Sequence, residues 1–117
     1  MRDDGVYLEY IVENIELAER FLAPGGEFDK QLFRDDVLRQ AAVLRWMETL
    51  TDAAGDLSSE LRSRHPEIDW PKVTGFRNIL AHGYMQTDYE LVWETIVGHL
   101  PGLRRIVEEE LRQLGGD

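Results

Sequence analysis

The sequence contains no cysteine, which excludes disulfide bonds, zinc–cysteine sites and thiol nucleophiles. It also lacks any apolar run near the roughly 18 residues that a membrane-crossing helix needs. The first five residues, MRDDG, have none of the charged-then-apolar layout of a signal peptide. We therefore expect a cytoplasmic protein without membrane contact. A length of 117 residues predicts a single domain, 1–117.

Positive charge is scarce as well. Lys and Arg total 13 against 23 Asp and Glu, which gives a formal net charge of −10. Stable nucleic-acid binders usually carry a basic face, so this balance counts against that class. An enzyme that cuts RNA transiently needs only a local basic pocket, and an acidic surface also suits a more basic protein partner. The three histidines are too scattered to predict a metal site.

What is present is helical periodicity. Apolar residues recur at spacings of three and four almost throughout, and alternation typical of strands is nowhere sustained. A first amphipathic helix should end at Pro24-Gly25-Gly26, a strong stop signal. Its apolar stripe comprises Leu8, Ile11, Ile15, Ala18 and Leu22. The predicted fold class is all-α, an antiparallel bundle of four to five helices.

The remaining helices are predicted from their start and stop signals. The second should begin between Asp29 and Asp36 and break at Gly55. A third should run from about Pro71 to Gly83, and Thr87 opens a capping box for the next. Pro101 should begin the last helix. The buried side of the second helix is expected to contain Val37, Leu38, Ala41, Ala42, Leu44, Met47 and Leu50.

Several polar and aromatic residues have ordinary structural interpretations. His65 and His99 are expected to cap the ends of helices. The run Glu108-Glu109-Glu110 is expected to be a solvated face. Tyrosine and tryptophan rings are expected to pack in the core or at an interface, and these are Tyr7, Tyr10, Tyr89, Trp46, Trp70 and Trp93.

Residues 77–84, RNILAHGY, bring an arginine, a histidine and a tyrosine together within about two helical turns. Arg77 can hold a phosphate with two N–H groups, and His82 can transfer protons near neutral pH. Asn78 lies four residues before His82, so the two share a helix face, whereas Arg77 and His82 are about 140° apart. The long arginine stem can still bring both groups to one cleft.

These groups predict cleavage of a phosphodiester. A helix carboxyl end favours a charged imidazole, and Arg77 would stabilise the added negative charge of the transition state. The RNA 2′-hydroxyl would be the nucleophile and leave a cyclic phosphate, so no metal or other cofactor is needed. The alternative is that Arg77 and His82 only form salt bridges and caps.

The motif and its surroundings resemble HepT-like ribonuclease toxins of the HEPN domain superfamily. The likeness extends over nearly the whole chain and is most specific at Pro66–Trp70, Gly75–Asn78, His82–Tyr84, Val92–Ile96 and Leu100-Pro101. This resemblance implies an antiparallel helical bundle that forms a homodimer, with active sites in the cleft between subunits. It implies Arg77 and His82 as the catalytic pair and Asn78 as a supporting residue.

The resemblance also implies a partner. In the family, a nucleotidyltransferase antitoxin transfers AMP from ATP to a tyrosine that matches Tyr84, and the added charge would exclude RNA. Two positions depart from the family pattern. Thr51-Asp52 replaces a usual Gly-Glu, and aspartate, being shorter than glutamate, has less reach toward the motif. Trp46 replaces a small polar residue.

Two points of function and assembly follow from the residues themselves. Phe33, Trp46 and Tyr10 add more apolar surface than one small bundle can hide, which favours a homodimer. An alternative function is a non-catalytic helical module that binds a nucleotidyltransferase or a nucleotide, with Arg77 contacting phosphate.

Overall fold

The computed structural model describes residues 3–81 and 89–115, which form six α-helices and no β-strand. The all-α prediction is therefore confirmed. The helices are α1 (Asp4–Leu22), α2 (Lys30–Asp35), α3 (Val37–Gly55), α4 (Ser59–Ser63), α5 (Trp70–Ala81) and α7 (Tyr89–Leu114). No helix in these described ranges is long and apolar enough to cross a membrane.

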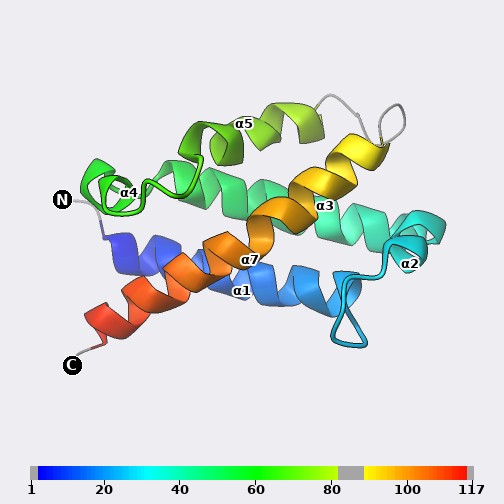
Figure 1. The fold of residues 1–117 in the computed structure, drawn as a ribbon, viewed down its shortest axis with the longest axis horizontal. Helices are drawn as coiled ribbons and strands as arrows, with labels where there is room; N and C mark the ends of the chain where they lie inside the picture. Colours follow the sequence, from blue (N-terminus) through cyan, green and yellow to red (C-terminus); the bar gives the residue numbers. More distant parts are fainter. Residues whose placement is uncertain (1–2, 82–88, 116–117) are drawn as a thin grey trace.

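Four long helices make the bundle. Figure 1 shows α1, α3, α5 and α7 running in alternating directions along the chain, with the short helices α2 and α4 at opposite ends of α3. Helix α1 packs against both α3 and α7, and α5 packs mainly against α3. Because α5 lies alongside α3, residues of α3 are the natural partners for any site on α5.

The core contains the stripe predicted for the first helix. All five of its apolar residues are fully buried, and α1 ends at Leu22, two residues before Pro24. Burying a leucine or isoleucine side chain stabilises the fold by about 1.5–3 kcal/mol. The other helices contribute Met47, Leu50, Phe76, Ile96 and Leu100 to the same core.

The predicted second helix is two helices. Asp29 caps α2, where its carboxylate accepts a hydrogen bond from the backbone N–H of Leu32 at 3.0 Å. Asp36 caps α3 in the same way through the N–H of Arg39, also at 3.0 Å. Asp36 has an extended backbone, so the helix direction changes there. The predicted end at Gly55 is confirmed.

The expected burial of Val37 and Leu38 is wrong. They are 75% and 82% exposed, and Ala41 is exposed too. The reason is that Arg39 faces the end of α1 instead: its Nη1 donates to the carbonyl of Phe21 at 3.0 Å, and its guanidinium lies 5.1 Å from the Phe21 ring centroid. The first turn of α3 therefore presents its apolar side chains to solvent.

Helix α7 continues through Pro101, so the predicted break there is wrong, and His99 lies inside a helix rather than capping one. Proline removes one N–H donor and crowds the carbonyl four residues earlier, which normally ends a helix. Here buried residues on both sides of the proline, Leu100 and Leu103, pack into the core. Tertiary packing therefore outweighs the local cost.

Candidate functional site

Arg77 lies on the outer face of α5 and pairs with α3. Its Nη1 is 3.2 Å from Oδ1 of Asp52, and both side chains are exposed. Although aspartate is shorter than glutamate, the carboxylate of Asp52 reaches the arginine of the motif. The ion pair fixes the direction of the guanidinium while leaving it accessible to a ligand.

Packing between α3 and α5 sets up this pair. Val73 and Phe76 on the inner side of α5 are buried, which turns Arg77 outward. One turn before Arg77, Thr74 lies beside Gly55, since a Cβ added at that glycine would be 3.6 Å from Cγ2 of Thr74. The end of α3 and the middle of α5 thus lie close together over one helical turn.

The other motif residues are described only in part. Asn78 is exposed and follows Arg77 on α5. His82 and Tyr84 lie outside the described residues, and so does the capping-box residue Thr87. The roles of His82 and Tyr84, and the meeting of Arg77 with His82 in one cleft, stay predictions.

A second feature lies next to Asp52. A pocket of about 260 Å³ on the outer face of α1 and α3 is lined by Tyr7, Tyr10, Arg45, Thr49, Asp52, Ala53 and Asp56. Tyr10 is 51% exposed, so it does not pack in the core, and its packing at an interface stays a prediction. Sequence reasoning missed this pocket because the residues come from two helices whose relative placement is a tertiary property.

Two predictions about aromatic residues can be refined. Phe33 is fully buried, where its ring lies 5.4 Å from that of Trp93, so it adds nothing to an exposed dimer face. Trp46 is partly buried and packs edge-on against Phe21 with ring centroids 5.0 Å apart. Trp70 and Trp93 are buried, as expected.

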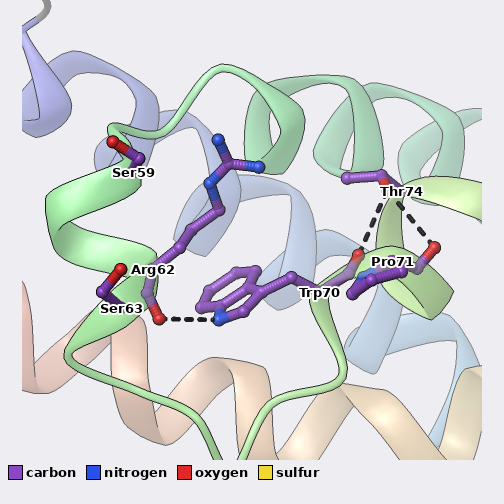
Figure 2. A pocket seen from close by; sticks show the side chains of 6 residues that line it. All are labelled: Ser59, Arg62, Ser63, Trp70, Pro71 and Thr74. Atoms are coloured by element: carbon purple, nitrogen blue, oxygen red, sulfur yellow. Dashed lines mark hydrogen bonds between the residues drawn. The ribbon is translucent and has the colours of Figure 1, made fainter.

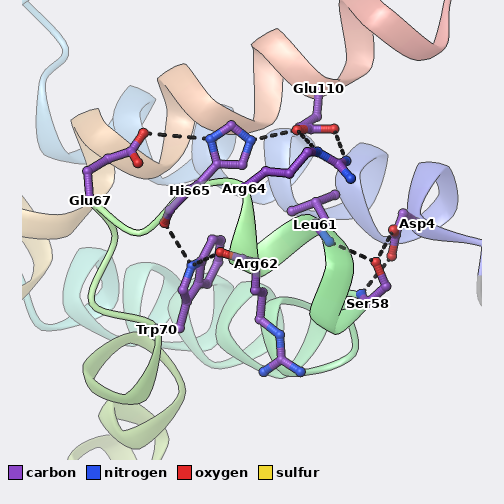
Figure 3. A network of polar contacts seen from close by, with 9 residues as sticks. All are labelled: Asp4, Ser58, Leu61, Arg62, Arg64, His65, Glu67, Trp70 and Glu110. Carbon is purple, nitrogen blue, oxygen red and sulfur yellow. Dashed lines mark hydrogen bonds and ion pairs between the residues drawn. The ribbon is translucent and has the colours of Figure 1, made fainter.

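A histidine–glutamate pair elsewhere resembles catalytic machinery but is structural. Figure 3 shows His65 and Arg64 meeting Glu110 of α7. His65 Nε2 lies 2.6 Å from Glu110 Oε2, and the two residues are only 7% and 5% exposed. The expectations that His65 caps a helix and that Glu110 is solvated are therefore wrong, because the two side chains satisfy each other across 45 residues.

The charge state of Glu110 follows from these contacts. Burial alone would raise its pKa, but hydrogen bonds from Arg64 and His65 and the positive charge nearby outweigh burial, and the pKa lies below its ordinary value. Glu110 is therefore ionised and ties α7 to the segment after α4. Within the described part of the chain, no group of three His, Asp or Glu side chains could hold a metal ion.

Comparison with known proteins identifies a family and several relatives of the chain. The HepT-like family model, described as ribonuclease HepT-like, matches residues 11–110. A protein of Caldanaerobacter subterraneus subsp. tengcongensis, named as a candidate RNase, is 34% identical over 114 residues, covering 97% of this chain and 98% of that protein. A Thermococcus cleftensis protein, named as a candidate HepT ribonuclease, is 34% identical over 98 residues, covering 84% and 86%.

A third relative is longer. A Methanocaldococcus jannaschii protein, whose name combines a gamma-glutamylcyclotransferase with a candidate RNase, is 30% identical over 113 residues, which cover 97% of this chain and 50% of that protein. No solved structure matches the chain. The family model covers most of the sequence, and the relatives match it from near one end to the other. The chain belongs to the HepT-like ribonuclease family of the HEPN superfamily.

Proposed function

We propose that this protein is a metal-independent endoribonuclease and the toxin of a type VII-like toxin–antitoxin pair. Its family supports ribonuclease activity. The observation that carries the proposal is the exposed guanidinium of Arg77, which Asp52 orients at the surface of α5. A guanidinium held in this way can bind a phosphodiester through two N–H groups. Asn78 and His82 follow it in the sequence.

The proposed reaction is an internal transesterification. The RNA 2′-oxygen attacks the adjacent phosphorus and the bond to the 5′-oxygen breaks, which leaves a 2′,3′-cyclic phosphate and a 5′-hydroxyl. His82 takes up the proton of the 2′-hydroxyl, and an imidazolium supplies the proton that the leaving 5′-oxygen needs. Arg77 stabilises the extra negative charge on the phosphorane. DNA resists cleavage because it lacks the 2′-hydroxyl.

The proposal includes a homodimer with its active sites at the cleft between subunits. Exposed apolar side chains on the described surface support association, among them Val6, Tyr10, Val37, Leu38 and Leu91. In such a dimer two copies of His82 share one cleft, so one imidazole can accept a proton while the other donates one.

Control by an antitoxin belongs to the same proposal. A nucleotidyltransferase would transfer AMP from ATP to the hydroxyl of Tyr84, two residues after His82. The added phosphate brings negative charge and bulk to the place where RNA must bind. Incubating the protein with a co-encoded nucleotidyltransferase and ATP should add the mass of one AMP per chain. Tyr84→Phe should gain none, and a gain on that variant would move the modification to another residue.

Cleavage of a labelled single-stranded RNA in excess EDTA tests the central claim. Wild type should cut and leave cyclic-phosphate ends, while Arg77→Ala and His82→Ala should each lose roughly a hundredfold or more in rate. Cutting only when a divalent metal is supplied would contradict the metal-independent mechanism. A protein with unmodified Tyr84 that leaves every RNA intact would contradict the ribonuclease assignment.

A second candidate function is a non-catalytic module that binds a nucleotidyltransferase or a nucleotide. The net charge of −10 favours it, since such a surface suits a basic protein better than RNA. On this reading Arg77→Ala weakens binding of the partner or nucleotide, whereas His82→Ala changes little. The two variants, measured side by side for binding and for cleavage, separate the two functions.

A further inference from the structure

The described surface contains a pocket between α4 and the beginning of α5. It has a volume of about 460 Å³ and is lined by Ser59, Arg62, Ser63, Trp70, Pro71 and Thr74. Figure 2 shows the Arg62 side chain extending from α4 into the space between Ser59 and Thr74. None of the six lining residues is acidic, in a chain with 23 carboxylates among 117 residues. We call this the Arg62 pocket.

Arg62 has a donor that no protein group satisfies. Its Nε is buried and has no hydrogen-bond partner, and among the described residues no carboxylate forms an ion pair with its guanidinium. Its neighbour Arg64, by contrast, is paired with Glu110 through Nη2 at 2.8 Å. Because Nε is covered, an anion that enters the pocket would meet the two terminal nitrogens of the guanidinium, whose charge no described carboxylate neutralises.

The frame around Arg62 is fixed before any ligand arrives. The indole N–H of Trp70 donates to the carbonyl of Arg62 and to that of His65, each at 3.1 Å. The Oγ of Ser58 lies 2.6 Å from the carboxylate of Asp4, which ties the start of α4 to α1. A preformed site of this kind loses little conformational freedom when it binds.

The donor set fits a phosphate. Arginine and serine or threonine hydroxyls are among the groups that contact phosphate oxygens in nucleic-acid complexes. Ser59 and Ser63 supply hydroxyls at the rim. Thr74 also lines the pocket, but its hydroxyl donates to the carbonyls of Trp70 and Pro71 at 3.1 and 3.3 Å and is therefore not counted among the donors for a phosphate.

The pocket is close to the proposed site of cleavage. Thr74 lines it and lies three residues before Arg77 on α5, a separation that puts two side chains on adjoining positions of one helix face. The rise between them is about one helical turn, roughly 5 Å. A single strand that places one phosphate on Arg77 can therefore place a neighbouring phosphate at the Arg62 pocket.

We propose that the Arg62 pocket binds a backbone phosphate of the RNA strand beside the phosphate that is cleaved at Arg77. This inference rests on the proposed ribonuclease function and describes how the RNA substrate is positioned on the protein. Phosphate contacts fix register without reading sequence. In a protein with a net charge of −10, Arg62 provides a local positive charge that no described carboxylate pairs with, and this charge can attract RNA.

Binding of a fluorescent single-stranded RNA with 2′-O-methyl groups tests the pocket, because this probe has no nucleophile and cannot be cut. Arg62→Gln should weaken binding roughly tenfold at low salt. It should also reduce the slope of log affinity against log salt by about 0.7, the value for one phosphate contact on a single strand. Arg105→Gln, which removes an exposed arginine of α7 outside the pocket, should leave both unchanged.

Ser59→Asp is an independent variant that adds a carboxylate at the rim, and it should weaken binding as well. On unmodified RNA, Arg62→Gln should raise KM more than it lowers kcat. If Arg62→Gln and Ser59→Asp both bind RNA with the affinity and salt slope of wild type, and wild type cuts RNA, the proposed role of the pocket is wrong and the ribonuclease function stands. Wild-type protein that neither binds nor cuts RNA would overturn both. Thermal unfolding of each variant checks that it is folded.

Discussion

At the scale of single residues, the candidate site depends on how charges are paired. Among the described residues Arg77 pairs with the exposed carboxylate of Asp52, whereas the buried Glu110 pairs with Arg64 and His65. An exposed pair contributes only about 0–1 kcal/mol to stability, while breaking a buried one costs several. The first pair therefore serves orientation and the second serves the fold.

Asp52→Asn should lower RNA cleavage roughly threefold to tenfold, because Arg77 loses the group that orients it. Stability should change by less than about 0.5 kcal/mol, since both partners are exposed. Glu48→Gln, which breaks the exposed ion pair with Arg45 on the same helix, is the matched control and should leave cleavage unchanged. Equal cleavage by Asp52→Asn and wild type would show that the carboxylate does not position Arg77.

Glu110→Gln should destabilise the protein by about 2–3 kcal/mol near pH 7, because His65 and Arg64 lose an ionised partner. The folded pKa of Glu110 is lowered, so its charge stabilises the fold above its ordinary pKa of 4.5, and this contribution is lost as pH falls through the lowered value. The difference in Tm between wild type and variant should therefore shrink in acid. Glu109→Gln is the control. A Tm difference between wild type and Glu110→Gln that does not change with pH would contradict a stabilising role for the Glu110 charge.

At the scale of helices, sequence signals were reliable where they were local. The stripe of α1 and the end of α3 at Gly55 follow from periodicity and a glycine, and both are confirmed. The break predicted at Pro101 was wrong because burial of Leu100 and Leu103 outweighs the proline. Local patterns cannot report packing against distant helices.

Pro101→Ala should stabilise α7 by roughly 1 kcal/mol and raise Tm, because alanine restores a backbone donor and removes the crowding inside the helix. Pro24→Ala is the contrasting variant. That proline lies in the loop after α1, where its loss should lower stability by about 0.4–1 kcal/mol through greater freedom of the unfolded chain. Lower stability in both variants would mean that the Pro101 ring packs favourably against its surroundings.

Some features of the candidate site could be predicted from neighbouring residues in the sequence, and others depend on contacts between distant segments. The motif around Arg77 could be recognised from its order along the chain, and its place on a helix could be predicted. Asp52 was singled out only through the family resemblance, as an acid with less reach. Its contact with Arg77 and the Arg62 pocket could not be predicted, because each depends on which helices lie side by side. The pair of His65 and Glu110 was missed for the same reason.

At the scale of the whole molecule, the proposed dimer is open to a direct test. Light scattering at micromolar concentration should give about twice the chain mass of 13.6 kDa. A double variant, Val37→Lys with Leu38→Lys, removes exposed apolar surface without touching the core and should weaken association if the start of α3 contributes. A mass of one chain for wild type would contradict the dimer.

The alternating direction of the helices has a practical consequence. The start of α1 and the end of α7 lie at the same end of the bundle, and the carboxyl end of α5, where the motif begins, lies toward the other end (Figure 1). The longest dimension of the molecule is 43 Å. The start of α1 nevertheless lies near the candidate site, because Tyr7 lines one pocket with Asp52, the partner of Arg77. A fluorescent reporter or a surface-immobilisation handle for single-molecule recordings of RNA turnover is therefore better joined after α7 than before α1.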